Sequence, residues 1–160
     1  MGFELPAAIG AKVGRPQDVV WAIAGDGSFQ MTLQELGTIV QDDIDVKIAI
    51  MNNGYLGMVR QWQELFYGRR YVATPLSSPD FVKLAESYGI GGLKVVGKLQ
   101  VESAIQTAME HSGPFLIEFV VEPEENVYPM VAPGASISEI IEAPRQKVAL
   151  GSKPKDVSNL

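Results

Sequence analysis

One stretch of the sequence decides the fold: Val19-Val20-Trp21-Ala22-Ile23-Ala24-Gly25-Asp26-Gly27-Ser28. Residues 19–24 are all apolar and end at a glycine, which is typical of a β-strand buried on both faces. Val46–Met51, which are apolar except for Lys47, follow a similar pattern and run into Asn52-Asn53. The 24 residues between the two polar motifs, 28–51, provide room for one helix and the second strand. The sequence therefore predicts two parallel strands whose polar ends meet at one edge of a sheet.

The rest of the chain continues the alternation of strand-like and helix-like stretches. Further strands are predicted at Leu93–Val96 and Phe115–Val121. Helices are predicted at residues 6–11, from Thr32 to about Gln41, at Gly57–Phe66, from Ser78-Pro79-Asp80 onward, and at Val101–His111. This order predicts an α/β fold, a flavodoxin-like parallel sheet flanked by helices, with ligands at the carboxyl ends of the strands.

The helix after the first motif opens with the sequence of a capping box. Thr32 is expected to be its N-cap, and Glu35, three residues later, is expected to return the hydrogen bond. Leu33, Leu36 and Ile39 then lie on one face of this helix, which we expect to pack on the sheet.

Composition narrows the classes of function. Of 160 residues, 46% are hydrophobic and 20% are charged, as in an ordinary globular domain. The net charge of -6 argues against a nucleic-acid partner and against binding to an anionic membrane. No apolar run approaches the ~20 residues of a transmembrane helix, and no secretory signal is recognisable, so a cytoplasmic location is the default expectation. The lack of cysteine excludes disulfides, thiolate metal sites and cysteine nucleophiles.

The two polar motifs suit a diphosphate bridged by a metal ion. Gly25 and Gly27 are expected to let the backbone turn sharply and approach a ligand, with N–H groups directed at phosphate oxygens. Asp26 offers an anionic oxygen and an asparagine amide offers a neutral one, and Mg²⁺ prefers such oxygen ligands together with phosphates and water. Taken alone, Gly-Asp-Gly is more often a plain turn. Its pairing with Asn52-Asn53 after a second apolar strand favours a magnesium–diphosphate site.

The region from Gly25 to Asn53 resembles the Gly-Asp-Gly…Asn-Asn signature of thiamine diphosphate enzymes. Within these enzymes, residues 1–141 are most similar to the C-terminal, diphosphate-binding domain of the acetolactate (acetohydroxyacid) synthase catalytic subunit. The segment Gly57-Met58-Val59-Arg60-Gln61-Trp62-Gln63 favours this family over related decarboxylases and oxidases. The other matching stretches are Met1–Ala11, Gly25–Met31, Gln34–Leu36, Met51–Asn53 with Gly54-Tyr55-Leu56, and Pro129–Gly134.

The resemblance implies roles for the residues around the metal ion. Asp26 and Asn53 would bind Mg²⁺ through their side chains, and Tyr55 through its backbone carbonyl. Gly25, Gly27 and Ser28 would contact the diphosphate of the cofactor.

A second group of residues is implied to face the reacting molecules. Met58 matches a position near the cofactor, and Val59 and Trp62 match positions near the second 2-keto acid. The family's preference for 2-ketobutyrate is associated with the tryptophan. Without the resemblance, Trp62 would be interpreted as a core aromatic of an amphipathic helix.

The resemblance also implies a larger enzyme. Acetolactate synthase decarboxylates pyruvate and joins the hydroxyethyl unit to pyruvate or 2-ketobutyrate in isoleucine and valine biosynthesis. Family members add an FAD-binding domain and a pyrimidine-binding domain with the catalytic glutamate. They form their sites between subunits of a homo-oligomer, with or without a regulatory subunit. We therefore expect a partial, N-terminally incomplete chain that has no general acid or base, binds no FAD by itself and is inactive alone.

Two alternatives to this function remain open. The chain could belong to another thiamine diphosphate-dependent decarboxylase, oxidase or carboligase. It could also be a non-catalytic module that binds a cofactor or a partner chain.

Within the chain, a cofactor-binding domain is predicted at 1–143 and a flexible tail at 144–160, where Pro, Gly, Ser and basic residues predominate. Glu4 stands where the family usually has glycine, so it either brings negative charge near the diphosphate or points to solvent. Arg60, Arg69 and Arg70 could reach an anionic substrate or the diphosphate, but surface charges are the commoner outcome and are expected here.

Overall fold

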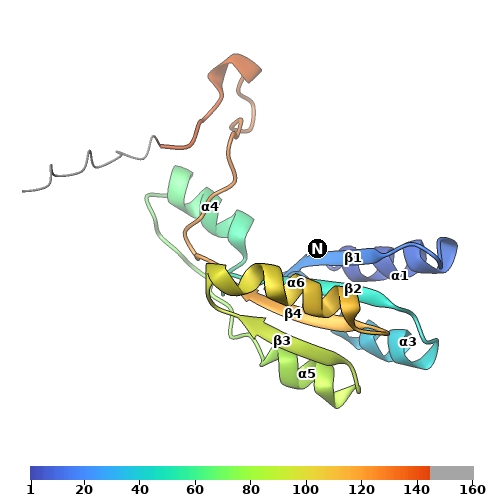
Figure 1. Cartoon of the computed structure of the whole chain (residues 1–160). Coiled ribbons are helices and arrows are strands. Elements are labelled where there is room, and N and C mark those ends of the chain that lie inside the picture. Colours follow the sequence, from blue (N-terminus) through green and yellow to red (C-terminus); the bar gives the residue numbers. More distant parts are fainter. Residues whose placement is uncertain (145–160) are drawn as a thin grey trace, which may run out of the picture. The chain divides into compact units, whose positions relative to one another are not determined.

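Four strands form one parallel sheet in residues 1–144, the part of the chain that the computed structural model describes (Figure 1). Their order across the sheet is β1 (Val20–Gly25), β2 (Val46–Asn52), β4 (Phe115–Val120) and β3 (Gly91–Val95). The predicted α/β class and parallel sheet are confirmed. Gly25 lies opposite Met51 in the register, so β1 and β2 end at the same edge.

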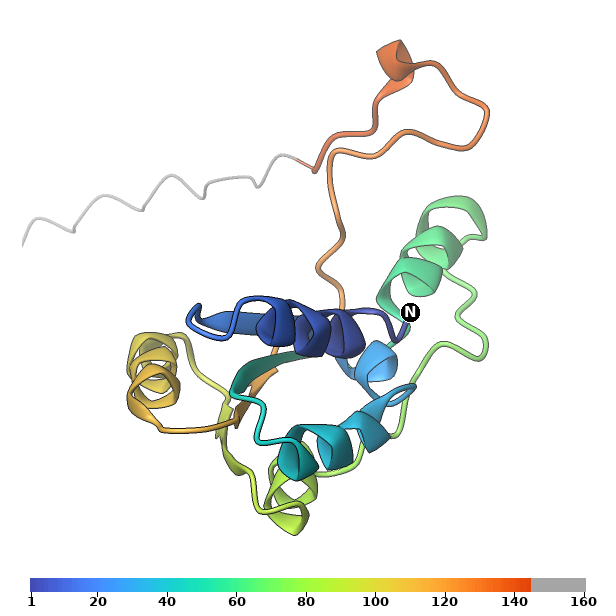
Figure 2. The ribbon, with the colours of Figure 1, turned by 90° about the vertical axis from the view of Figure 1, so that its right-hand side faces the viewer.

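Helices cover the two faces of this sheet unequally. The larger core cluster joins one face to α1 (Glu4–Gly14), α3 (Leu36–Gln41) and α5 (Phe81–Ser87). The smaller cluster joins the opposite face to α6 (Val101–Glu110). Figure 2 shows α6 on one side of the sheet and α3 and α5 on the other. Along β2, Ile48 and Ile50 face the larger cluster and Ala49 faces the smaller one, which is the two-residue alternation of a strand.

The remaining helices follow the ends of the strands. α2 (Asp26–Phe29) is a single turn directly after β1, and α4 (Gly57–Phe66) follows β2 with the bounds that the sequence predicts. Asp80 caps α5 by accepting a hydrogen bond from the Lys83 backbone N–H at 3.1 Å, as expected of a helix opened by Ser78-Pro79-Asp80. Short 3₁₀ turns at Leu33–Glu35 and Lys98–Gln100 precede α3 and α6.

The predicted capping box at Thr32 is wrong. Residues 33–35 form a 3₁₀ turn, and the buried Thr32 hydroxyl makes no hydrogen bond within the described part of the chain. The backbone already closes this region, because Thr32 N–H donates to the Phe29 carbonyl and Glu35 N–H to the Thr32 carbonyl. The Glu35 carboxylate instead accepts from the Thr38 hydroxyl at 2.8 Å.

A buried lysine joins β2 to the end of α6. Lys47 is 4% exposed and pairs with Asp45 at 2.7 Å. Its ammonium also donates to the carbonyls of His111 and Gly113. Lys47 therefore connects the amino end of the sheet to the C-terminal end of a helix, where a positive charge is favourable.

Residues 126–144 form a separate small unit. It contains a 3₁₀ turn at Ile137–Glu139, capped by Ser136, and an antiparallel bridge between Met130 and Ile141. The domain boundary at 143 stays a prediction, and residues 145–160 of the predicted tail lie outside the described residues.

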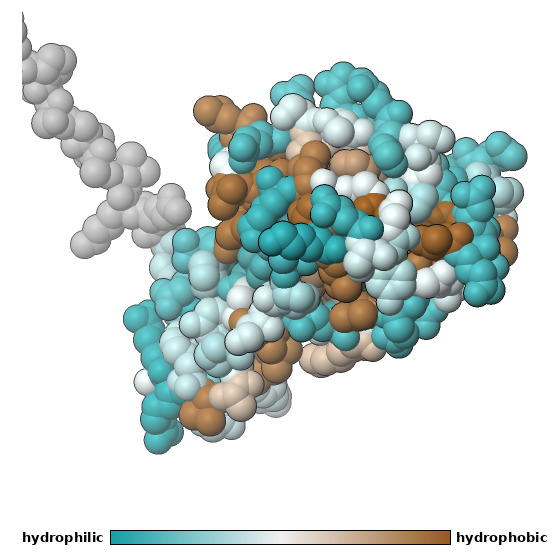
Figure 3. All heavy atoms as spheres, turned by 90° about the horizontal axis from the view of Figure 1, so that it is seen from below, coloured by the Kyte–Doolittle hydropathy of each residue, from teal (hydrophilic) through white to brown (hydrophobic). Residues whose placement is uncertain are grey.

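The surface mixes residue types. On the face drawn in Figure 3, hydrophobic residues lie among hydrophilic ones, as is usual for protein surfaces. None of the helices within residues 1–144 has both the length and the apolar character needed to cross a membrane.

Candidate functional site

A cavity of about 300 Å³ lies where β1 and β2 end. It collects residues from both polar motifs and from the start of α4. Of the predicted site residues, its lining includes Gly25, Asp26, Gly27, Ser28, Asn53, Tyr55, Met58 and Val59. The strand pairing thus brings together at one edge two motifs that are separated by 24 residues in the sequence.

Trp62 is the predicted site residue that does not line this cavity. It lies on α4, 37% exposed, in a neighbouring hollow that also contains Met58 and Val59. Its ring meets Phe66 edge-on, with 5.6 Å between the ring centroids. Trp62 is therefore not a buried core aromatic.

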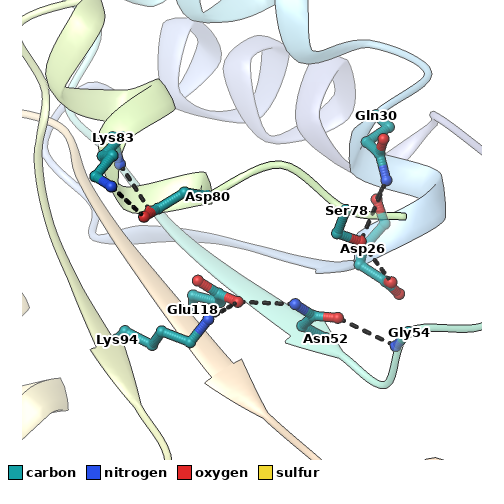
Figure 4. Close-up of polar contacts among 9 residues, drawn as sticks. All are labelled: Asp26, Gln30, Asn52, Gly54, Ser78, Asp80, Lys83, Lys94 and Glu118. Atoms are coloured by element: carbon teal, nitrogen blue, oxygen red, sulfur yellow. Dashed lines mark hydrogen bonds and ion pairs between the residues drawn. The ribbon is translucent and has the colours of Figure 1, made fainter. Parts of the chain in front are cut away.

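Asp26 is a buried carboxylate at the start of α2. Its residue is 1% exposed, and the Ser78 hydroxyl donates to Oδ2 at 3.1 Å (Figure 4). Burial raises the pKa of the Asp26 carboxyl, and the Ser78 hydroxyl and the N–H groups of Gly27 and Gly54 counter part of that rise. Within residues 1–144 no lysine or arginine pairs with it. Asp26 thus presents a desolvated negative charge to the cavity without a counter-charge from the chain.

The loop after β2 is tied to a second segment of the chain. The Leu56 N–H donates to the Thr74 carbonyl at 2.9 Å, and the Leu76 N–H donates to the Gly54 carbonyl at 2.8 Å. Within the loop, Oδ1 of Asn53 accepts from the Tyr55 N–H at 3.0 Å. A side-chain oxygen has a second lone pair, so Asn53 keeps acceptor capacity for a ligand.

Gly57 is a site residue that sequence reasoning missed. A Cβ at this position would lie 2.9 Å from Nδ2 of Asn53. The missing side chain therefore makes room for the Asn53 amide beside the start of α4. Gly57 is the first residue of the family-specific stretch Gly57–Gln63, and a glycine at the start of a helix is a signal for close packing.

The sharp backbone turn expected of the glycines in the first motif is wrong. Gly25 has an extended backbone, with φ -75° and ψ 153°, and Gly27 lies in α2 without a positive φ. At Gly27 an added Cβ would lie 2.7 Å from Leu76 Cδ1, so glycine is needed there for packing. At Gly25 an added Cβ would meet no atom within 4 Å, so this residue leaves open space at the cavity.

Ser28 is held by the beginning of the chain. The Gly2 N–H donates to its hydroxyl oxygen at 2.7 Å, and Gly2 has a φ of +72° that favours glycine. Because the Ser28 oxygen accepts this bond, its own proton is left for a ligand: no acceptor for it is found within residues 1–144.

Beneath the loop lies a polar network that the sequence did not indicate. Glu118 on β4 is 0% exposed, and its Oε1 accepts from Nδ2 of Asn52 and from Nζ of Lys94, both at 2.8 Å. Oδ1 of Asn52 accepts in turn from the Gly54 N–H at 3.1 Å (Figure 4). The available signal was a charged residue inside each of two otherwise apolar strands, which lie opposite each other in the register.

The three arginines that follow the site in the sequence differ in burial. Arg69 and Arg70 are exposed as expected, but the expectation is wrong for Arg60, which is 1% exposed. Its guanidinium pairs with Glu64 at 3.1 Å and Glu124 at 3.4 Å. It also lies over the rings of Tyr55 and Tyr71. These contacts replace water around the charge, which is how a buried arginine is tolerated.

Glu4 does not line the cavity. Its side chain is half-buried in the first turn of α1, and Oε1 is buried without a hydrogen bond in the described residues. Neither expected placement, in the cofactor pocket or out in solvent, describes it.

The chemistry of the cavity suits an oxygen-loving cation bound together with a ligand. No three His, Asp or Glu side chains gather into a metal-binding group within residues 1–144. A cation here would therefore rely on Asp26, neutral oxygens of the Asn53 loop and oxygens of the ligand itself. Mg²⁺ with a phosphate-bearing ligand fits this donor set.

Comparisons with known proteins agree with this chemistry. The sequence profile described as "Thiamine pyrophosphate enzyme, C-terminal TPP binding domain" matches residues 1–119. The acetolactate synthase large subunit of Cyanidium caldarium is 50% identical over 148 residues, which cover 91% of this chain and 25% of that protein. The acetolactate synthase isozyme 2 large subunit of Escherichia coli K12 is 50% identical over 143 residues, covering 89% and 26%.

A solved structure shares the fold. The thiamine diphosphate-dependent 4-hydroxybenzoylformate decarboxylase of Rhodococcus jostii RHA1 matches with a TM-score of 0.72 and 33% identity. The match covers 79% of this chain and 24% of that chain. The chain therefore spans about a quarter of the length of these relatives.

Proposed function

The chain belongs to the thiamine pyrophosphate (thiamine diphosphate) enzyme family through its C-terminal cofactor-binding domain, and we propose that it is the diphosphate- and magnesium-binding part of an acetolactate synthase. The observation that carries the proposal is the shared cavity, in which Asp26 from the end of β1 meets Asn53 from the loop after β2. The identity of 50% to synthase large subunits supports this activity over others in the family.

In this proposal the side chains of Asp26 and Asn53 and the backbone carbonyl of Tyr55 bind Mg²⁺. The environment of Asp26 supports the assignment, because a buried carboxylate without a cation gains most from a divalent ion. Oxygens of the cofactor diphosphate and of water would supply the remaining ligands of the ion.

The backbones of Gly25 and Gly27 and the hydroxyl of Ser28 hold the diphosphate. Gly25 leaves open space on its Cα, and the Ser28 proton is oriented by the bond that its oxygen accepts from Gly2. Both features favour a close approach of phosphate oxygens.

Met58, Val59 and Trp62 form the side of the site that meets the reacting molecules. Their exposed fractions of 54%, 45% and 37% leave apolar surface beside the cavity. Met58 contacts the cofactor, and Val59 and Trp62 contact the acceptor 2-keto acid. One additional methylene against such a surface is worth ~1–3 kcal/mol, enough to favour 2-ketobutyrate over pyruvate.

The parent reaction decarboxylates pyruvate and joins the hydroxyethyl unit to a second 2-keto acid, in isoleucine and valine biosynthesis. When bound, thiamine diphosphate supplies the carbanion chemistry, and residues of this chain bind and orient it. In the full-length protein, a pyrimidine-binding domain supplies the catalytic glutamate and a further domain binds FAD. The full-length protein forms a homo-oligomer in the cytoplasm. The isolated chain binds the cofactor but is inactive.

A second candidate is a thiamine diphosphate-dependent 2-keto acid decarboxylase, which the shared fold of the Rhodococcus jostii enzyme favours. The products formed from pyruvate distinguish the two functions. A synthase containing this segment releases acetolactate, whereas a decarboxylase releases acetaldehyde.

The binding proposal is tested by calorimetric titration of the chain with thiamine diphosphate, with and without Mg²⁺, and with Asp26→Ala as the control. We expect binding that needs both the metal ion and Asp26. A folded chain that binds no cofactor, or binds it equally well without either, would overturn the proposal.

A further inference from the structure

We propose that Glu118 is a positioning residue for the magnesium-binding loop and that it acts through the side chain of Asn52. This inference rests on the proposed function, because the loop carries Asn53 and Tyr55. Glu118 is fully buried on β4 and does not line the cavity. Any influence on the site must therefore pass through a neighbouring group.

The contact between Glu118 and Asn52 fixes one orientation of the Asn52 amide. A carboxylate oxygen only accepts hydrogen bonds, so Nδ2 of Asn52 faces Oε1 of Glu118, 2.8 Å away. Oδ1 is then directed at the Gly54 N–H, 3.1 Å away. A flipped amide would lose both hydrogen bonds, so Glu118 determines that Oδ1 of Asn52, and not Nδ2, faces the loop backbone.

Lys94 keeps Glu118 available for this task. Its ammonium lies 2.8 Å from the same Oε1, and the two residues are opposite each other in the register of β3 and β4. The Lys94 side chain is 47% exposed while that of Glu118 is 1% exposed. The pair thus balances a buried charge from a partly solvated position, and charge-assisted hydrogen bonds are stronger than neutral ones.

The network ends at the point where the loop turns. Gly54 has a φ of +68°, a conformation open to glycine and adopted rarely by other residues. Its N–H is held by Asn52, and the next N–H, that of Tyr55, is held by Asn53. The orientation of the turn therefore sets where the two predicted magnesium ligands project.

The chain offers a matched control on the same strand. Lys47 is also a buried charge on β2, but it lies at the opposite end and bonds to Asp45, His111 and Gly113. Replacing it removes buried polar contacts without touching the loop. Lys47→Met should lower the free energy of unfolding and leave cofactor binding unchanged.

The test compares the wild-type chain with Glu118→Ala, Glu118→Gln and Lys47→Met. Two quantities are measured: the Mg²⁺ concentration for half-maximal thiamine diphosphate binding, and amide hydrogen exchange at Gly54 and Tyr55 without ligand. Glu118→Ala should raise the Mg²⁺ requirement about tenfold, as is typical when a group behind a metal ligand is lost, and should accelerate exchange at both amides. Glu118→Gln keeps an acceptor for Asn52, so its Mg²⁺ requirement and its exchange rates at the two amides should both lie close to those of the wild type. Lys47→Met should match the wild type in both.

The outcomes separate the two proposals. If Glu118→Ala unfolds more easily but changes neither quantity, Glu118 is only a structural ion-pair residue and the inference is overturned. If the wild type shows no magnesium-dependent binding, the proposed function fails, while hydrogen exchange still decides whether Glu118 orders the loop. Should Glu118→Ala not fold, Asn52→Ala, which leaves the Glu118–Lys94 pair in place, must show the same two changes for the inference to stand.

Discussion

The Ser78 hydroxyl donates a hydrogen bond to Oδ2 of Asp26 over 3.1 Å, although the two lie 52 positions apart in the sequence. Gln30 supports the contact from the other side, since its Nε2 lies 3.5 Å from the Ser78 oxygen and 3.3 Å from the Asp26 carbonyl (Figure 4). The segment before α5 thereby fixes one oxygen of the carboxylate.

Ser78→Ala should weaken magnesium-dependent cofactor binding several-fold, because loss of the hydroxyl raises the pKa of Asp26 further. Protons and Mg²⁺ compete for the same carboxylate, so the loss should be larger at mildly acidic pH than at neutral pH. Calorimetric titrations at several pH values measure it. The exposed neighbour provides the control, and equal effects of Ser78→Ala and Ser77→Ala would contradict the assigned contact.

Asp26→Asn should stabilise the ligand-free chain at neutral pH while abolishing its response to Mg²⁺. The pKa of Asp26 is raised above 3.8 in the folded chain, so the folded state binds the proton more tightly than the unfolded state. The stabilisation by the neutral carboxyl is therefore lost as the pH rises from 3.8 through the folded pKa. Replacing the charge should raise the free energy of unfolding at neutral pH and leave it unchanged at low pH, as measured by urea unfolding.

Asp80→Ala should show the opposite pH dependence. The backbone N–H of Lys83 lowers the pKa of Asp80 below 3.8, so this cap stabilises the fold above that pH and loses its effect as the pH falls through the folded pKa. The variant should be less stable than the wild type at neutral pH and equal to it in strong acid. A constant difference across the pH range would show that the charge of Asp80 plays no part.

Gly57→Ala should damage the site without unfolding the chain. The added Cβ would lie 2.9 Å from Nδ2 of Asn53 and displace that amide, while alanine itself favours the helix. We expect the Mg²⁺ concentration for half-maximal cofactor binding to rise at least tenfold. Gly10→Ala is the matched control, because its Cβ meets nothing within 4 Å in α1, and it should stabilise the chain by about 0.5–1 kcal/mol.

Arg60→Met should loosen α4 and lower the free energy of unfolding by about 1–3 kcal/mol, because Glu64 loses a buried partner. Hydrogen exchange should accelerate in α4 and remain slow in β2. Arg70→Met removes an exposed charge and should have little effect. Unaltered exchange in α4 would show that its packing on Tyr55 does not depend on the guanidinium.

The sequence predicted the features that depend on local pattern. Apolar runs located β1 and β2, and the parallel pairing that they imply brought Asp26 and Asn53 to one edge. The period of the apolar residues and the spacing of the two motifs suffice to predict this common edge, because the carboxyl ends of parallel strands joined by a helix lie on the same side of the sheet.

The predictions that the structure contradicts concern residues whose positions depend on contacts between distant segments of the chain. Arg60 was expected at the surface, yet it is buried, because Glu124 supplies a counter-charge in addition to Glu64 and the Tyr71 ring lies against its guanidinium. Gly27 was assigned to a turn, but its reason is Leu76, which the sequence does not place nearby. Thr32 failed as a cap because an unforeseen turn at α2 had already closed the backbone.

The order of the strands has a consequence for biosynthesis. Of the four strands in residues 1–144, β4 is the last to leave the ribosome but lies between β2 and β3, so the sheet has a gap until it arrives. The bond from Asn52 to Glu118 spans 66 residues and waits for the same strand. Such non-local pairing folds slowly and exposes unpaired strands meanwhile. A nascent chain that ends before β4 therefore contains both predicted cofactor motifs but lacks the polar support that Glu118 gives to the loop beneath them.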